Sequence, residues 1–165
     1  MTIGKKMQDA LNKQINAELY SSYLYLSMAA YFETQNLRGM AAWMEAQAGE
    51  EQGHAMRIYK FVNDRSGTVT LEAIEKPKTD WSSPQEAFDD AYAHEQKVSK
   101  MIHDLVDLAN QEKDHASFTM LQWFVQEQVE EEDSTGTIAD QLSKIKDSPN
   151  GLFMLDHALG QRKGD

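Results

Sequence analysis

Apolar residues recur at intervals of three and four along most of the chain, the spacing of one buried face of an amphipathic helix. Between residues 40 and 61 this face is formed by Met40, Met44, Gln47, Glu51, His54, Ile58 and Phe61. A face that packs against a core should be apolar throughout, yet Glu51 and His54 lie at its centre. An ionised carboxylate that leaves water costs several kcal/mol unless a cation or a donor pairs with it. This face is therefore expected either to stay exposed or to hold a cation.

Three further stretches repeat the pattern, and each has a polar residue in the middle of its apolar face. Glu18 is that residue in the first stretch, with Tyr25 two turns later on the same face. Glu95 is the polar residue in the third stretch. Gln128 and Glu131 occupy the corresponding place in the fourth.

The same periodicity predicts an all-α protein with four long helices and a short fifth one. The helices are expected at about 5–34, 40–65, 83–109, 114–145 and 152–159. Gly39 is expected to end the first turn between helices, as a glycine stop. Ser83 and Glu86 predict a capping box with Pro84 as the first helical residue.

Residues 66–83 show no helical period, and Pro77 interrupts them. The preceding helix would be about 39 Å long at about 1.5 Å per residue. An extended chain covers up to about 3.3 Å per residue, so this segment can run the whole length of that helix. The second and third helices can then be parallel, while short turns make the other sequential pairs antiparallel. The expected fold is a single domain over residues 1–165, a four-helix bundle with one long crossover between its second and third helices.

The composition and charge of the chain restrict the kinds of partner that the protein is expected to bind. The formal net charge of −11 argues against nucleic acid and favours metal cations. The absence of cysteine removes disulfides and thiolate metal sites, and it suits a reducing compartment. No signal peptide is recognisable, and the most apolar run, residues 24–32, is too short to cross a bilayer. We therefore expect a cytoplasmic protein without a membrane partner.

The four helices together place a carboxylate-rich layer inside the bundle. Its members are Glu18, Glu51, His54, Glu95, Gln128 and Glu131. The alternative is a plain polar layer held by hydrogen bonds. It is improbable, however, that four helices would place polar residues on their inner faces at matching heights by chance. Four carboxylates balance two divalent cations, which indicates two metals bridged by shared carboxylates. Oxygen ligands with one imidazole and no sulfur favour iron(II) or manganese over structural zinc.

A second acidic group lies beside this layer. Glu50, Glu127 and Glu130 each precede an inward residue by one position, so all three are rotated by about 100° in the same sense. They are candidates for a third, outer metal site. The alternative is a solvated acidic face on the fourth helix.

The sequence resembles the non-haem ferritins of bacteria and archaea over almost its whole length. The resemblance rests on the run from Asn16 to Tyr25, on Glu50-Glu51 with His54, on Glu95 and on the run from Leu121 to Glu132. It implies a single ferritin-like domain over residues 1–165 with a di-iron ferroxidase centre. In this centre Glu18, Glu51 and His54 hold the first iron, with Glu51 as the bridge. It assigns Glu95 and Glu131 to the second iron, with Gln128 beside it.

The resemblance implies several further properties. A third iron site would use Glu50, Glu127, Glu130 and Glu131. Tyr25 and Trp123 would lie close by as electron donors. Twenty-four subunits would form a hollow shell that stores ferric mineral. Haem is not expected, because Gln52 stands where bacterioferritins carry a haem-ligating methionine.

The predicted function is iron storage with ferroxidase activity, in which Fe(II) is oxidised by O₂ or hydrogen peroxide. A di-iron oxidase acting on an organic substrate is the alternative, and it needs an apolar pocket beside the metals. A metal-buffering cage with a degraded centre is a non-enzymatic alternative, against which the intact ligands on all four helices argue. Apolar residues expected on the outer helix faces predict subunit contacts: Leu26, Trp43, Tyr59 and Tyr92.

Overall fold

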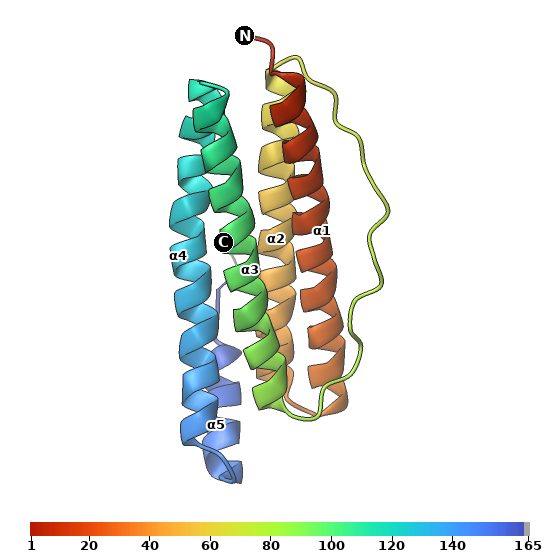
Figure 1. Cartoon of the computed structure of the whole chain (residues 1–165). Helices are drawn as coiled ribbons and strands as arrows, with labels where there is room; N and C mark the ends of the chain where they lie inside the picture. The colour runs from red at the N-terminus through yellow and green to blue at the C-terminus, as the bar shows by residue number, and fades with distance from the viewer. Residues whose placement is uncertain (164–165) are drawn as a thin grey trace.

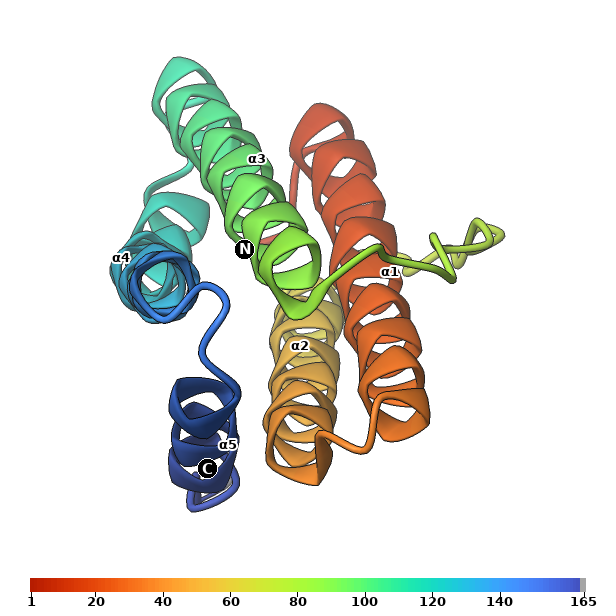
Figure 2. The ribbon, with the colours of Figure 1, turned by 90° about the horizontal axis from the view of Figure 1, so that it is seen from below.

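A computed structural model describes residues 1–163 of the chain, and it confirms the predicted fold class (Figure 1). Its helices are α1 (Lys5–Thr34), α2 (Arg38–Asp64), α3 (Pro84–Gln111), α4 (His115–Lys144) and α5 (Pro149–Leu159). The first four form the bundle, and α5 packs beside α2 at one end of it (Figure 2). Among residues 1–163, no helix combines the length and apolar character that crossing a membrane requires.

The long crossover between α2 and α3 runs back along the outside of α1, so α2 and α3 point in the same direction (Figure 1). Side chains of α1 hold it by donating to its backbone carbonyls. Asn12 Nδ2 donates to the Thr68 oxygen at 2.9 Å, and Ser27 Oγ donates to the Lys78 oxygen at 2.7 Å. The predicted parallel pair is therefore present, and the segment that makes it possible is fixed along its length.

The predicted cap at Ser83 is present with one change of partner, and Asp114 caps α4 in the same way. The Ser83 hydroxyl accepts from the Glu86 amide at 3.1 Å, and Asp114 accepts from the Ser117 amide at 3.1 Å. The Glu86 carboxylate, however, accepts from the amide of Ser82 rather than from that of Ser83, at 2.5 Å. Each cap satisfies amide groups that have no partner inside the helix.

Gly39 does not end the turn after α1, contrary to the sequence-based expectation. The residue with a left-handed backbone is Asn36, with φ of 57°, and α2 already begins at Arg38. Gly39 lies inside α2, where a Cβ atom would come within 1.8 Å of the Asp156 carbonyl oxygen of α5. Its lack of a side chain lets the two helix backbones meet.

Two apolar clusters fill the bundle, one above and one below the polar layer. Met44, Phe88 and Ile138 belong to the cluster nearer α5, while Ile58 and Phe124 belong to the other. The inward glutamates therefore lie between two regions of core, far from bulk water.

The prediction that Trp43 faces outward is wrong, because its side chain is 5% exposed and its ring meets the Phe88 ring edge to face within the chain. Tyr92 is only half-buried and packs beside Gly136. Leu26 and Tyr59 are 52% and 39% exposed, so they remain candidates for subunit contacts.

Candidate metal centre

The polar layer brings its ligand-type side chains together at mid-bundle. Glu18, Glu51 and His54 offer ligand atoms within 4.8 Å of one another, and so do Glu51, Glu95 and Glu131. Glu51 belongs to both groups. The arrangement therefore offers two adjacent sites with one shared carboxylate, the pattern predicted from the helix faces.

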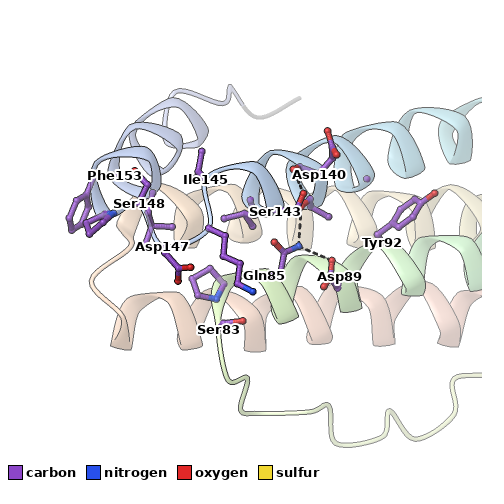
Figure 3. A pocket seen from close by; sticks show the side chains of 17 residues that line it. Ser83, Gln85, Asp89, Tyr92, Asp140, Ser143, Ile145, Asp147, Ser148 and Phe153 are labelled. Carbon is purple, nitrogen blue, oxygen red and sulfur yellow. Dashed lines mark hydrogen bonds between the residues drawn. The ribbon is translucent and has the colours of Figure 1, made fainter.

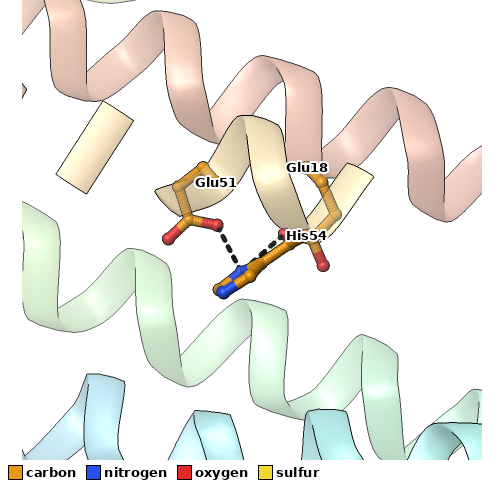
Figure 4. Close-up of side chains that lie close together, drawn as sticks. All are labelled: Glu18, Glu51 and His54. Atoms are coloured by element: carbon orange, nitrogen blue, oxygen red, sulfur yellow. Dashed lines mark hydrogen bonds and ion pairs between the residues drawn. The ribbon is translucent and has the colours of Figure 1, made fainter. Parts of the chain in front are cut away.

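The first group is built by α1 and α2 (Figure 4). His54 lies one helical turn after Glu51, and its Nδ1 is 3.1 Å from the Glu51 Oε2. The same nitrogen is 3.9 Å from the Glu18 Oε2 on the neighbouring helix. The Trp123 ring meets the His54 ring edge to face at 5.4 Å, which restricts the orientation of the imidazole.

The second group joins α3 and α4 to Glu51. The Tyr25 hydroxyl donates to the Glu95 Oε1 at 2.5 Å, and Gln128 Nε2 donates to the other carboxylate oxygen of Glu95 at 3.1 Å. Gln128 Nε2 also lies 3.2 Å from the Ser99 hydroxyl. Both oxygens of Glu95 are thus oriented by neighbouring donors, and Gln128 turns its amide nitrogen toward the centre.

Burial makes the charged forms of these carboxyl groups costly. Desolvation is the main cause that raises the pKa of Glu18, Glu51 and Glu95 above the usual range. It also raises the pKa of Glu131 to about 8, with the charge of Glu95 as the next cause. Without a cation the centre therefore retains protons at neutral pH, and a bound cation would displace them.

A carboxylate oxygen of Glu18 gives the clearest indication that a cation fits this site. Its Oε1 accepts from Gln14 Nε2 at 2.9 Å, whereas its buried Oε2 finds no hydrogen-bond partner among residues 1–163. A buried carboxylate oxygen without a partner is rare, since its desolvation remains uncompensated. A divalent cation between Glu18, Glu51 and His54 would satisfy that oxygen, and the donor set suits iron(II).

Two glutamines that contact the site carboxylates were not assigned to the site from the sequence. Gln47 Nε2 donates to the Glu51 Oε1 at 3.0 Å and to the Glu131 Oε2 at 2.6 Å. Gln14 holds Glu18 from one turn away. The sequence feature that could have identified both residues is a glutamine on the inward face of a helix. Gln47 lies on the inward face described for residues 40–61, and Gln14 lies four residues before Glu18.

The three residues predicted for an outer site, Glu50, Glu127 and Glu130, have different surroundings in the structure. Glu127 lies beside the centre, with its Oε2 at 3.7 Å from His54 Nε2, and it forms a third ligand-type group with His54 and Glu131. Glu130 is exposed. Glu50 pairs instead with Arg162, at 2.8 Å.

A surface cavity of about 1010 Å³ lies elsewhere, between the start of α3, the end of α4 and the start of α5 (Figure 3). Its lining includes Gln85, Tyr92, Asp140, Ile145 and Phe153. None of the described residues that line it is a candidate metal ligand.

Comparisons with known proteins identify the family of this chain. A family model described as a ferritin-like domain matches residues 8–145. A bacterial non-heme ferritin of Bacteroides fragilis is 43% identical over 160 residues, covering 97% of this chain and 99% of that protein. One from Staphylococcus saprophyticus is 40% identical over 163 residues, covering 99% and 98%.

Solved structures give the same result. The open-pore ferritin from the hyperthermophilic archaeon Archaeoglobus fulgidus is 49% identical, with a TM-score of 0.98 over 98% of this chain and all of that chain. A humanized archaeal ferritin is 48% identical, with a TM-score of 0.98 and 99% of each chain covered. This chain therefore belongs to the ferritin family, among the non-haem ferritins of bacteria and archaea.

Proposed function

We propose that the protein stores iron and oxidises Fe(II) at the centre between α1, α2, α3 and α4. The observation that carries the proposal is the pair of ligand-type groups that share Glu51. Two Fe(II) ions held this close can each give one electron to the same oxidant. A pair of Fe(II) ions would reduce O₂ to hydrogen peroxide, or hydrogen peroxide to water, in one two-electron step.

The roles of the residues follow from their positions. Glu18 and His54 would bind one Fe(II), Glu95 and Glu131 the other, and Glu51 both. Gln47, Gln128 and Tyr25 would orient the carboxylates by donating hydrogen bonds to them, as outer residues do around metal ligands. Protons released when Fe(II) binds would leave from the carboxyl groups whose pKa burial has raised.

Glu51→Ala tests this role most simply, because Glu51 alone is common to both groups. We expect the fast phase of Fe(II) oxidation to be lost in stopped-flow absorbance while the bundle still folds. Removing one of four buried carboxylates relieves repulsion in the metal-free protein. Glu45→Ala is the matched control, since Glu45 is an exposed glutamate on the same helix. An unchanged fast phase in Glu51→Ala would place the oxidation elsewhere.

A di-iron oxidase acting on an organic substrate receives less support. Such an enzyme needs an apolar pocket beside the metals, and the large cavity of Figure 3 lies away from the candidate ligands. Addition of Fe(II) and oxygen distinguishes the two functions. Iron storage predicts that ferric iron accumulates in the protein over many turnovers, whereas the oxidase predicts turnover only with an added organic substrate.

The proposal includes a cage, expected to contain 24 subunits, with ferric mineral inside and a location in the cytoplasm. It also includes a weaker outer iron site near Glu127, to which Glu50 and Glu130 would contribute. His54, Glu127 and Glu131 already offer ligand atoms within 4.8 Å of one another, which supports a site at this place. Haem is not expected to take part.

A further inference from the structure

Arg162, just beyond the end of α5, reaches back to α2 beside the metal centre. Its Nη2 is 2.8 Å from the Glu50 Oε2, and its Nη1 donates to the Trp43 carbonyl oxygen at 3.2 Å. The guanidinium also lies 4.5 Å from the centre of the Trp43 ring. Both members of the ion pair are only 19% exposed, so water weakens this pair less than it weakens a pair on the open surface.

The segment that carries Arg162 is anchored by other contacts. Asp156 on α5 accepts from the Met40 amide through its Oδ1 at 2.8 Å, and Gly39 lets α5 approach α2 closely. The Arg162 amide donates to the Leu159 oxygen at 3.2 Å. The position of Arg162 therefore does not depend on Glu50 alone.

Glu50 links this ion pair to the iron chemistry. It immediately precedes Glu51, the carboxylate shared by both ligand groups, and its charge is one of the causes that raise the pKa of Glu131. A carboxylate held by a guanidinium has less affinity for a metal, because the metal must displace the guanidinium or share the oxygens with it. The cationic side chain also repels a divalent ion nearby.

We propose that Arg162 competes with iron for Glu50 and thereby keeps the outer iron site weak. This inference rests on the outer site of the proposed function. In the iron-free protein the guanidinium of Arg162 forms an ion pair with Glu50. An iron ion that binds at the outer site displaces Arg162 from Glu50, and the ion pair forms again when the iron leaves. A weak outer site of this kind would pass iron toward the cavity instead of retaining it.

The alternative is that Arg162 serves only to fasten the end of α5 to α2 through Trp43. The two roles differ in what happens at Glu50. A fastening role predicts a change in thermal stability with no change in metal affinity at the outer site. Competition predicts a change in metal affinity that requires Glu50.

Calorimetric titration of the assembled protein with Zn(II), a redox-inert probe, measures the binding steps without any turnover. Anaerobic Fe(II) gives the same measurement with the substrate itself. The variant is Arg162→Gln, and Arg38→Gln is the matched control because Arg38 is an exposed arginine on α2. Both changes are repeated in a Glu50→Gln background, and sedimentation and thermal melting verify assembly.

For Arg162→Gln we expect the weak outer step to tighten roughly tenfold, with the two strong steps unchanged. The tightening should be absent in Arg38→Gln and should disappear in the Glu50→Gln background. Arg162→Lys should give an intermediate affinity, because an ammonium keeps the charge but not the planar arrangement of donors. That variant also provides the test if Arg162→Gln does not assemble.

Two results would overturn the inference. One is an outer step of equal affinity in the parent and in Arg162→Gln, with both strong steps present, which leaves the proposed di-metal centre standing. The other is a tightening that persists without Glu50, which would mean a general effect of charge. Absence of the two strong steps in the parent would instead contradict the proposed function itself, and the inference with it.

Discussion

Glu131 lies 5% exposed between the two apolar clusters, and burial raises its pKa to about 8. In the unfolded chain a glutamate titrates near about 4.3. Between these two values the folded protein binds more protons than the unfolded chain, so the free energy of unfolding falls as pH rises. The stabilising contribution is complete below the unfolded pKa and is lost as pH rises through the folded pKa.

We therefore expect the metal-free protein to lose stability from pH 6 to pH 8, by up to about 1.4 kcal/mol per pH unit for this one group. Glu131→Gln cannot ionise and should flatten this part of the dependence. Its amide oxygen can still accept from Gln47. The measurement is the calorimetric melting temperature in the presence of a chelator at several pH values. Parallel curves for the parent and Glu131→Gln would show that Glu131 ionises normally in the fold.

Most residues of the candidate site were predictable from the sequence, because each one interrupts an apolar face. The same reasoning could not supply hydrogen-bond partners, since these depend on side-chain rotamers. Gln47 was predictable as an inward residue, but its hydrogen bonds to Glu51 and Glu131 depend on the packing of α2 against α4. The pairing of Glu50 with Arg162 joins residues 112 positions apart, and no periodicity carries that information.

At the scale of the helices, their type and most of their ends were predictable from local signals. Ser83 and Asp114 cap their helices as their chemistry suggests. The prediction for Gly39 was wrong because glycine is favoured both in turns and where two backbones come close together. The neighbouring sequence indicated a turn. The close contact is with α5, more than one hundred residues away in the sequence.

We expect Gly39→Ala to push α5 away from α2, since the new Cβ would meet the backbone oxygen of Asp156 and not a flexible side chain. Overpacking of this kind typically costs about 1–3 kcal/mol. Gly49→Ala in the same helix is the control. A Cβ at Gly49 has nothing within 4 Å, and alanine should stabilise the helix by about 0.5–1 kcal/mol.

Thermal melting compares the stabilities, and hydrogen exchange of α5 reports whether this helix detaches. Equal effects of the two substitutions would mean that α5 does not rest on Gly39.

At the scale of the whole molecule, helix lengths and the length of the crossover were sufficient to predict the topology. The crossover can reach from one end of α2 to the other, which is what makes the parallel pair possible (Figure 1). Contacts between subunits were harder to predict. An apolar residue on a helix can face a second subunit or another part of its own chain, as Trp43 does.

Leu26 tests the assembly. Its side chain is 52% exposed on α1, and Tyr23 nearby is 49% exposed. We expect Leu26→Arg to shift the protein from a large particle to small species in sedimentation velocity, because a charge would be buried at a subunit contact. Leu26→Met keeps the apolar character and should leave the particle intact. A full-size particle in Leu26→Arg would mean that this side chain faces solvent in the assembly.

The most direct test of the proposed di-iron centre is a crystal soaked anaerobically in Fe(II), with anomalous scattering measured at the iron absorption edge. We expect two strong peaks, one among Glu18, Glu51 and His54 and the other among Glu51, Glu95 and Glu131. Both peaks should be lost in Glu51→Ala or reduced to one of low occupancy. Iron only at other positions, with these carboxylates unbound, would contradict the proposed ferroxidase centre.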